Sequence, residues 1–268
     1  MGDLIKRAAQ DLIGSRYAIA LTGAGISTES GIPDFRGPSG IWTKNPQAER
    51  KAYQSYQGFL ADPKKWWEER LRGASLLGDL EKAKPNAGHY ALVELETMGL
   101  LKCVITQNVD ALHEKAGSVN VIEYHGSVLK LRCIDCGSRF KREDFDLERL
   151  RIEGALPPRC PKCRGVIKTD GVAFGEPIPD DVAHRSLEEA RKCDLMLICG
   201  TSAVVYPFAD LPRVARQRKD GIRETIIIEV NADPTPLTEA KISNYLIRGK
   251  TGEILPRLVE TIRRIRER

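Results

Sequence analysis

The feature that most constrains the fold is an apolar run near the N-terminus that ends in two closely spaced glycines. Residues 17–21 have the composition of a short buried strand, and Gly23 and Gly25 follow at once. Glycines allow close approach to the backbone, and the N–H groups of a helix that begins after such a loop point at a bound anion. The segment therefore predicts a strand–loop–helix unit that binds the phosphates of a nucleotide.

The spacing of the glycines differs from that of dinucleotide dehydrogenases. In their motif a third glycine follows three residues after the second, and an acidic residue closes the next strand about 20 residues later. Here Thr28 occupies the third position, and the loop continues to Pro33-Asp34-Phe35-Arg36-Gly37. This continuation places a carboxylate, an aromatic ring and a guanidinium beside the expected phosphates. The loop is therefore predicted to belong to a reaction centre.

Apolar runs and helical patterns alternate along the chain. Further strands are predicted at 101–106, 121–124, 194–200 and 224–231, and helices at 3–14, 86–99, 180–192, 207–219 and 252–267. Nearly continuous apolar strands that alternate with helices indicate a parallel sheet covered on both faces. The predicted fold class is α/β, a doubly wound, Rossmann-like parallel sheet that binds its ligands at the C-terminal ends of the strands.

Residues 38–85 interrupt this alternation. They are rich in aromatic and charged side chains and show no strand pattern. Asp62 and Pro63 form a favourable N-cap and first-turn pair for a helix that continues to about Leu77. We expect a helical module here that lies over the nucleotide as a lid.

Two Cys-x-x-Cys pairs, with 23 residues between them, are the strongest metal-binding signal in the chain. Each pair places two thiolates on one side of a tight turn, and the two pairs complete a tetrahedron around zinc. Four thiolates leave no open position for water or substrate, so we expect one structural zinc ion. The predicted ligands are Cys133, Cys136, Cys160 and Cys163.

Two other interpretations of the cysteines fit less well. A redox dithiol needs only one pair, and acidic residues between the pairs disfavour a ribbon that binds nucleic acid. The net charge of +5 is spread among interspersed charges, so direct nucleic-acid binding is not expected.

The four histidines form no metal-binding group. His89 and His113 lie within helical patterns and are expected to be structural, and His184 is expected to be solvated on a helix.

These patterns divide the 268 residues into three expected parts. Residues 1–37, 86–126 and 171–268 form the Rossmann-like nucleotide-binding domain, residues 38–85 the helical module, and residues 127–170 a zinc-ribbon module. No apolar run approaches the roughly 20 residues of a membrane span. The first residues also lack the apolar core of a signal peptide, so a cytoplasmic location is expected.

Together the motifs resemble those of the sirtuins, the NAD-dependent protein deacylases (deacetylases). The resemblance covers nearly the whole chain, and the order of the motifs makes it specific. It rests on the glycine loop from Gly23 to Gly37, Thr106-Gln-Asn-Val-Asp-Ala-Leu-His113, Tyr124-His-Gly126, the two cysteine pairs, Val172-Ala-Phe-Gly-Glu176, Gly200-Thr-Ser202 and Glu229-Val-Asn231.

The resemblance implies roles for individual residues. His125 would be the catalytic base, with Asn108 and Asp110 beside the nicotinamide and its ribose. The substrate peptide would pair as an added strand with the segment that contains Val172, Phe174, Gly175 and Glu176. NAD would contact Gly23, Ala24, Gly25, Asp34, Phe35, Arg36, Gln107, Asn108, Val109, Asp110, Gly200, Thr201, Ser202, Asn231 and Tyr245.

The implied reaction removes an acetyl or other acyl group from a lysine side chain of a protein or peptide. The acyl oxygen attacks the ribose carbon that bears nicotinamide, nicotinamide leaves, and an imidate intermediate forms. His125 then takes a proton from a ribose hydroxyl so that this oxygen can attack the intermediate, a task that suits imidazole at neutral pH. The products would be free lysine, nicotinamide and O-acyl-ADP-ribose.

Two positions depart from the family pattern. Sirtuins that prefer acidic acyl groups carry a tyrosine and an arginine three residues apart, where this chain has Trp67 and Arg70. Arg70 would pair with a malonyl or succinyl carboxylate, but Trp67 lacks the hydroxyl, so acetyl-lysine is the expected substrate and acidic acyl groups stay open. Tyr245 stands near the place where the family often has an aspartate close to the adenine.

Two other functions stay open from the sequence. A sensor that only binds NAD or ADP-ribose would use the same glycine loop, but it has no need of a base beside the ribose. An ADP-ribosyltransferase shares the loss of nicotinamide and sends the ribose to a protein nucleophile.

Overall fold

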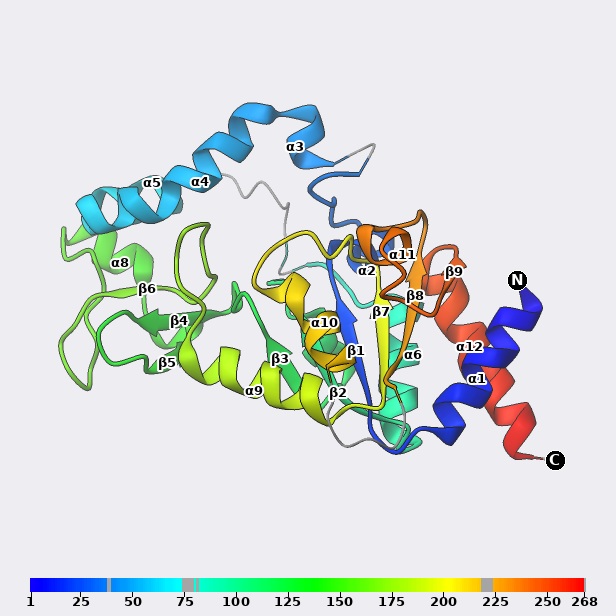
Figure 1. The fold of residues 1–268 in the computed structure, drawn as a ribbon. Coiled ribbons are helices and arrows are strands. Elements are labelled where there is room, and N and C mark those ends of the chain that lie inside the picture. Colours follow the sequence, from blue (N-terminus) through cyan, green and yellow to red (C-terminus); the bar gives the residue numbers. More distant parts are fainter. Residues whose placement is uncertain (38–39, 74–79, 81, 218–223, 268) are drawn as a thin grey trace.

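The computed structural model describes residues 1–37, 40–73, 80, 82–217 and 224–267. A parallel sheet with helices on both sides makes up the larger part of the molecule, and a smaller part holds a second sheet (Figure 1). The two termini lie at the end of the larger part that is remote from the second sheet, where the first and last helices pack together.

Six parallel strands form the larger sheet in the order β3-β2-β1-β7-β8-β9. Their bounds are β1 Ala18–Thr22, β2 Leu101–Thr106, β3 Val121–Glu123, β7 Leu195–Cys199, β8 Ile226–Asn231 and β9 Tyr245–Arg248. The chain winds outward in both directions from the neighbouring strands β1 and β7. In open α/β sheets ligands bind at the C-terminal ends of the strands where the winding reverses, so the site is expected beside this pair.

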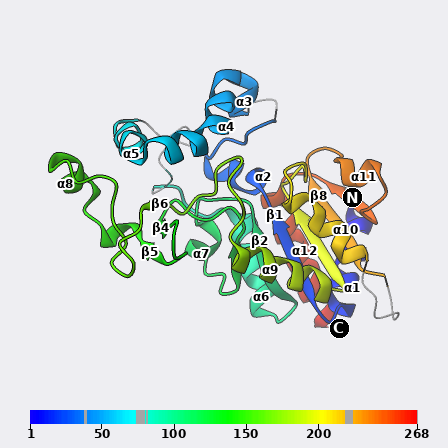
Figure 2. The ribbon, with the colours of Figure 1, turned by 60° about the vertical axis from the view of Figure 1, so that its left-hand side comes forward.

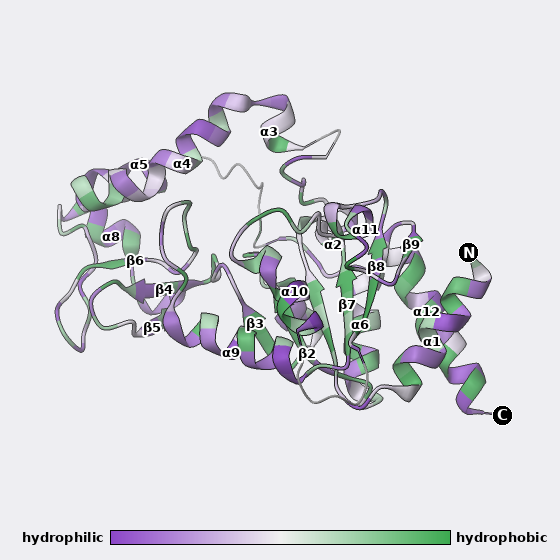
Figure 3. Ribbon diagram, viewed as in Figure 1, coloured by the Kyte–Doolittle hydropathy of each residue, from purple (hydrophilic) through white to green (hydrophobic). Residues whose placement is uncertain are grey.

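Helices cover both faces of the large sheet. On one face lie α1 (Gly2–Gly14), α6 (Ala87–Thr97) and α12 (Thr251–Arg266), and on the other α9 (Asp180–Lys192) and α10 (Leu211–Arg216). Because both faces are covered, the inner strands are apolar along their length, as the green strands β7 and β8 show in Figure 3. The predicted doubly wound α/β fold is confirmed.

Short helical segments complete the larger part. They are α2 (Ala24–Ser27), α7 (Leu112–Ala116), α11 (Pro236–Glu239) and the 3₁₀ turns Thr28–Ser30 and Phe208–Asp210. The helix predicted at 207–219 is therefore a 3₁₀ turn followed by α10, and residues 218 and 219 lie outside the described part of the chain. Among the described residues, no helix combines the length and the apolar character that crossing a membrane requires.

The sequence pattern did not predict β9. This strand lies at the edge of the sheet and pairs only with β8, and Ile247 is its one buried residue, since the other three are partly or fully exposed. It therefore lacks the continuous apolar run by which the inner strands are recognised.

The smaller part is built from two segments that are far apart in the sequence. The segment between β1 and β2 forms α3 (Ile41–Lys44), α4 (Pro46–Ala61) and α5 (Pro63–Arg72). The segment between β3 and β7 forms the antiparallel sheet β5-β4-β6, with β4 Lys130–Cys133, β5 Arg139–Lys141, β6 Ile167–Thr169, the 3₁₀ turn Arg142–Asp144 and α8 Leu147–Ile152. Figures 1 and 2 both show α3, α4 and α5 leading from the region of α2 to this second sheet.

Helix α5 begins where the sequence predicts. The Asp62 side chain accepts a hydrogen bond of 2.9 Å from the N–H of Lys65, which caps the helix. The helix ends at Arg72, because Gly73 is extended, and not at about Leu77 as predicted; residues 74–79 lie outside the described residues. Trp67 of α5 packs in one apolar cluster with Leu131 and Ile167, so the two inserted segments share a core.

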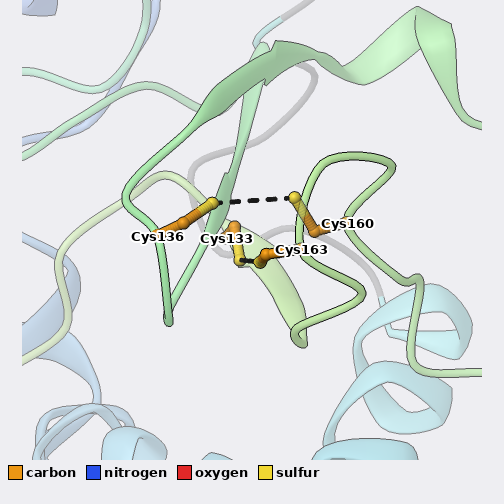
Figure 4. A group of neighbouring side chains, drawn as sticks. All are labelled: Cys133, Cys136, Cys160 and Cys163. Atoms are coloured by element: carbon orange, nitrogen blue, oxygen red, sulfur yellow. Dashed lines mark hydrogen bonds between the residues drawn. The ribbon is translucent and has the colours of Figure 1, made fainter.

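The four cysteines of the two Cys-x-x-Cys pairs converge at the end of β4 (Figure 4). Their Sγ atoms all lie within 4.8 Å of one another, with 3.5 Å between Cys133 and Cys163 and 3.7 Å between Cys136 and Cys160. A disulfide requires about 2.05 Å, whereas thiolates around one zinc ion lie about 3.8 Å apart. The cluster therefore fits a structural zinc site that ties the smaller part together.

Removal of one thiolate tests this site. In the variant Cys160→Ser the zinc content is expected to fall from about one ion per chain to almost none, and the protein should unfold at a lower temperature. Cys103→Ala is the matched control, because Cys103 is a buried thiol of β2 outside the cluster, and it should keep its zinc. Elemental analysis that finds no zinc in the wild type, or equal zinc in both variants, would contradict the assignment.

Two buried histidines lie against each other between α6 and α7. The rings of His89 and His113 have their centroids 4.9 Å apart, and Nε2 of His113 is 2.9 Å from Oγ1 of Thr22. Burial lowers the pKa of His89 to about 4 and the pKa of His113 to about 3. Both rings are therefore neutral at neutral pH.

This pair predicts a loss of stability in acid. In the unfolded chain a histidine takes up a proton below about pH 6.5, whereas these two stay neutral in the fold until about pH 4 and about pH 3. Protons therefore favour the unfolded chain, and the free energy of unfolding should fall by about 2 kcal/mol per histidine between pH 7 and pH 5. Urea unfolding at both pH values should show a smaller loss for His113→Asn than for the wild type. An equal fall in the free energy of unfolding for both proteins would show that His113 does not contribute to the loss of stability in acid.

Candidate active site

A cavity of about 840 Å³ opens at the C-terminal ends of the large sheet. Its walls come from the loops after β1, β2, β3, β7 and β8, from α4 and α5, and from the segment after β6. Most of the predicted site residues line this one cavity: Ala24, Gly25, Asp34, Phe35, Arg36, Arg70, Gln107, Asn108, Val109, Asp110, His125, Val172, Phe174, Gly175, Glu176, Gly200, Thr201, Ser202 and Asn231.

The glycine loop after β1 touches the loop after β7 through the backbone. The N–H of Gly25 donates a hydrogen bond of 2.8 Å to the carbonyl of Gly200. A Cβ atom on Gly25 would lie 2.7 Å from that same oxygen, and one on Gly23 would lie 2.6 Å from Cβ of Thr201. Only glycine fits at these two positions, because the contact leaves no room for a side chain.

The residues after β2 are tied to both of these loops. The Gln107 side chain donates to Oγ1 of Thr201 at 2.7 Å, and Nδ2 of Asn108 donates to the Gly23 carbonyl at 3.0 Å. Nδ2 of Asn108 also donates to Oγ of Ser27 at 3.0 Å. These side chains are thus held in place within the part of the site predicted to contact NAD.

Ser27 connects two of the predicted residues and was not itself predicted. Its hydroxyl is fully buried and donates to the Asp110 carboxylate at 2.7 Å, while it accepts from Asn108. Burial raises the pKa of Asp110, and hydrogen bonds from the N–H of Leu112 and from Ser27 oppose that rise. The position of Ser27 within the glycine loop was the only sequence signal for its role. Its partners Asn108 and Asp110 are 81 and 83 residues away, so the contacts could not be predicted from the local pattern.

His125 follows β3 and is held by a backbone carbonyl. Its Nδ1 lies 3.3 Å from the carbonyl oxygen of Gln107, so this bond requires the proton on Nδ1 and leaves a lone pair on Nε2. Burial lowers the pKa of His125 to about 4, and the bond to Gln107 opposes this effect. The ring packs against Tyr124 and Phe208. At neutral pH it is a neutral imidazole that can accept a proton.

The predicted substrate segment lies directly against this histidine. The N–H of Val172 donates to the carbonyl of His125 at 2.8 Å. The Phe174 ring packs in tilted contacts against Tyr53 of α4 and Trp42 of α3, with the ring centroids 4.5 Å and 5.4 Å apart. Because the Trp42 ring also contacts Phe35, with the centroids 4.9 Å apart, aromatic contacts join the glycine loop to the substrate segment.

The rest of the glycine loop and the end of β8 are fixed by local contacts. Asp34 accepts a hydrogen bond of 2.9 Å from the N–H of Gly37, and the Arg36 guanidinium lies 4.4 Å above the Trp42 ring. The side chain of Asn231 accepts from the N–H of Thr201 at 3.0 Å. Asn231 is thereby tied to the loop after β7.

Trp67 does not line the cavity, contrary to the expectation for an acyl-binding residue. It is fully buried in the core of the smaller part, and its indole N–H donates to the Ile167 carbonyl at 2.9 Å. Trp66 and Arg70 line the cavity instead, with the Arg70 guanidinium 5.0 Å from the Trp66 ring centre. Residues four apart share one helix face, whereas Trp67 points to the other side of α5.

Tyr245 also lies outside the cavity. It is the first residue of β9, whereas the cavity lies at the C-terminal ends of the strands. Its hydroxyl donates to Asp11 of α1 at 2.6 Å, and the Arg7 guanidinium lies 4.4 Å from its ring centre. Residues 249–251, which follow β9, line the cavity in its place.

Comparisons with known proteins agree with this geometry. The model of the Sir2 family matches residues 23–207. NAD-dependent protein deacylase 2 of Archaeoglobus fulgidus is 43% identical over 272 residues, which cover 99% of this chain and 99% of that protein.

Solved structures are similar over almost the same length. A Sir2 homolog in complex with NAD has a TM-score of 0.76 at 40% identity and covers 97% of this chain and 94% of its own. A Sir2 variant with a deacetylated p53 peptide and 3′-O-acetyl-ADP-ribose has a TM-score of 0.76 at 35% identity, covering 96% and 97%. The chain therefore belongs to the Sir2 family, the sirtuins.

Proposed function

We propose that the chain is an NAD-dependent protein lysine deacylase. It transfers an acyl group from a lysine side chain to the ADP-ribose part of NAD and yields nicotinamide, free lysine and O-acyl-ADP-ribose. The observation that carries the proposal is the meeting, in one cavity, of the glycine loop, the buried Asp110 and the neutral His125. Similar proteins that are named deacylases, or that hold NAD or a deacetylated peptide, support it.

In this proposal each segment that lines the cavity binds a different part of NAD or of the substrate. The glycine loop and residues 200–202 hold the phosphates and riboses of NAD, and Asn231 lies at the adenosine end. Asn108 and Asp110 hold the nicotinamide ribose and carboxamide, supported by Ser27. Residues 172–176 pair with the backbone of the substrate peptide, a mode of binding that tolerates many sequences.

His125 acts as the general base in this proposal. Since its Nδ1 is directed at the Gln107 carbonyl, Nε2 is the atom that takes the proton from the ribose hydroxyl. The lowered pKa keeps the ring unprotonated, and therefore available, throughout the neutral range.

The remaining parts of the proposal concern organisation and location. Residues 1–37, 86–126 and 171–268 form the NAD-binding domain, with a helical module at 38–85 and a zinc module at 127–170, which agrees with the separate apolar clusters of the two parts. A cytoplasmic location is part of the proposal and is supported by the seven cysteines, none of which forms a disulfide. Direct nucleic-acid binding is not part of the proposed function.

Loss of the imidazole tests the assignment of the base. His125→Ala should lower kcat for deacylation of an acetylated peptide by at least about 100-fold, because His125 is the only histidine among the described residues that line the cavity. The melting temperature should stay close to that of the wild type. His184→Ala, at an exposed histidine paired with Glu188, is the control and should keep full activity. Near-normal turnover by His125→Ala would rule out His125 as the base.

We propose acetyl-lysine as the main substrate, with acidic acyl groups accepted through Arg70. In Arg70→Met the ratio of kcat/KM for succinyl over acetyl peptide should fall about tenfold, because a charge-assisted bond to the carboxylate is lost. Arg72→Met, on the same helix but paired with Glu68, should leave the ratio unchanged. If Arg70→Met leaves the ratio of kcat/KM for succinyl over acetyl peptide unchanged, Arg70 does not bind the carboxylate of the acyl group.

A further inference from the structure

Four charged side chains are buried in a cluster beside the cavity. Lys168 and Asp170 keep only 2% and 1% of their surface exposed, and the side chains of Glu176 and Arg132 only 4% and 11%. Lys168 and Glu176 also line the cavity. Charges so deep are tolerated only when they are paired, so their partners show what the cluster does.

The ammonium group of Lys168 has three partners. Its Nζ donates to the carbonyl of Thr169 at 2.8 Å and to that of Gly171 at 2.6 Å. The third contact is an ion pair of 3.0 Å with Oε2 of Glu176. Lys168, at the centre of β6, therefore binds both the beginning and the end of the segment 171–176.

Both oxygens of the Glu176 carboxylate are bonded inside the protein. Oε1 accepts from Arg132 of β4 at 2.6 Å, and Oε2 accepts from the N–H of Ala173 at 2.9 Å in addition to its contact with Lys168. Arg132 also places its Nε 3.1 Å from the carboxylate of Asp170. These contacts give the Glu176 carboxylate a structural role inside the protein.

The same segment is attached to the backbone of the proposed base. The N–H of Val172 donates to the carbonyl of His125. The backbone of Asp170 also lies against Gly126, because a Cβ atom on Gly126 would be only 2.2 Å from the Asp170 carbonyl oxygen. A shift of residues 170–176 would therefore displace the histidine and the peptide-binding edge together.

We propose that Lys168 and Arg132 are positioning residues, which hold the segment 170–176 through Asp170 and Glu176 so that the substrate peptide meets His125 in one register. This inference rests on the proposed function. Arg132 directly precedes the zinc ligand Cys133 at the end of β4, so the metal cluster, the charge cluster and the substrate segment form one continuous support. The zinc module would thus contribute to substrate binding without touching the substrate.

Kinetics of a charge-deleted variant test the inference. Lys168→Met keeps the length of the side chain but leaves Glu176 without its lysine partner. The KM for the acylated peptide should rise by at least about tenfold, while the KM for NAD stays within about twofold. Lys168→Arg, which restores a cation, should recover most of the peptide affinity. Lys141→Met, at an exposed lysine of β5 in the same sheet, is the matched control and should behave as the wild type.

Several results would overturn the inference. One is an unchanged KM for the peptide, and another is an equal rise of both Michaelis constants, which would mark the cluster as a general stabiliser of the fold. Failure of Lys168→Arg to recover any peptide affinity would also overturn it. If Lys168→Met does not fold, Glu176→Gln applies the same test, because it preserves the shape and removes the charge.

Hydrogen exchange separates this inference from the proposed function. In Lys168→Met the amides of residues 171–176 should exchange at least about tenfold faster than in the wild type, with no change in β1. Unchanged exchange there would overturn the inference whatever the activity. A wild-type protein that releases no nicotinamide with NAD and acetylated peptide would refute the proposed function alone, since the exchange measurement needs no turnover.

Discussion

The site depends on the backbone contact between the loop after β1 and the loop after β7. These strands are parallel neighbours, so both loops leave the same edge of the sheet. Gly25 and Gly200 then approach so closely that a Cβ atom on Gly200 would lie 2.3 Å from the backbone nitrogen of Ile26. Gly200 also has a φ of +61°, which favours glycine. The loop after β2 is placed relative to this contact, since Gln107 and Asn108 bond to the two loops.

Around this contact the protein holds polar groups in position before any ligand arrives. Asn108, Ser27 and Asp110 form a continuous hydrogen-bonded series, and His125 is fixed by the Gln107 carbonyl. Groups that are already oriented and shielded from water stabilise developing charge without reorganising during the reaction. In the proposed reaction, positive charge develops on the ribose carbon when nicotinamide leaves, and the buried Asp110 carboxylate is one of the groups that line the cavity. A docking site alone would not require a base fixed by a backbone carbonyl beside a buried carboxylate.

The fold and most of the cavity could be predicted because their signals are local. The apolar strands, the glycine loop and the cysteine pairs are each visible within a few residues of sequence. Trp67 and Tyr245 were misplaced because the side on which a residue lies depends on neighbours in space: α5 turns Trp67 into a core made with β4 and β6. The charge cluster around Lys168 was not predicted for the same reason. Two of its members, Arg132 and Glu176, are in contact although they are 44 residues apart in the sequence.

The central claim is that the cavity couples cleavage of NAD to removal of an acyl group from lysine. The most direct measurement is mass spectrometry of the products after the purified protein is incubated with NAD and an acetylated lysine peptide. The account predicts equal amounts of nicotinamide, deacetylated peptide and O-acetyl-ADP-ribose, with no product when NAD is omitted. ADP-ribose attached to protein while the peptide stays acetylated would indicate a transferase, and unchanged NAD would indicate a binding protein. Either result would contradict the account.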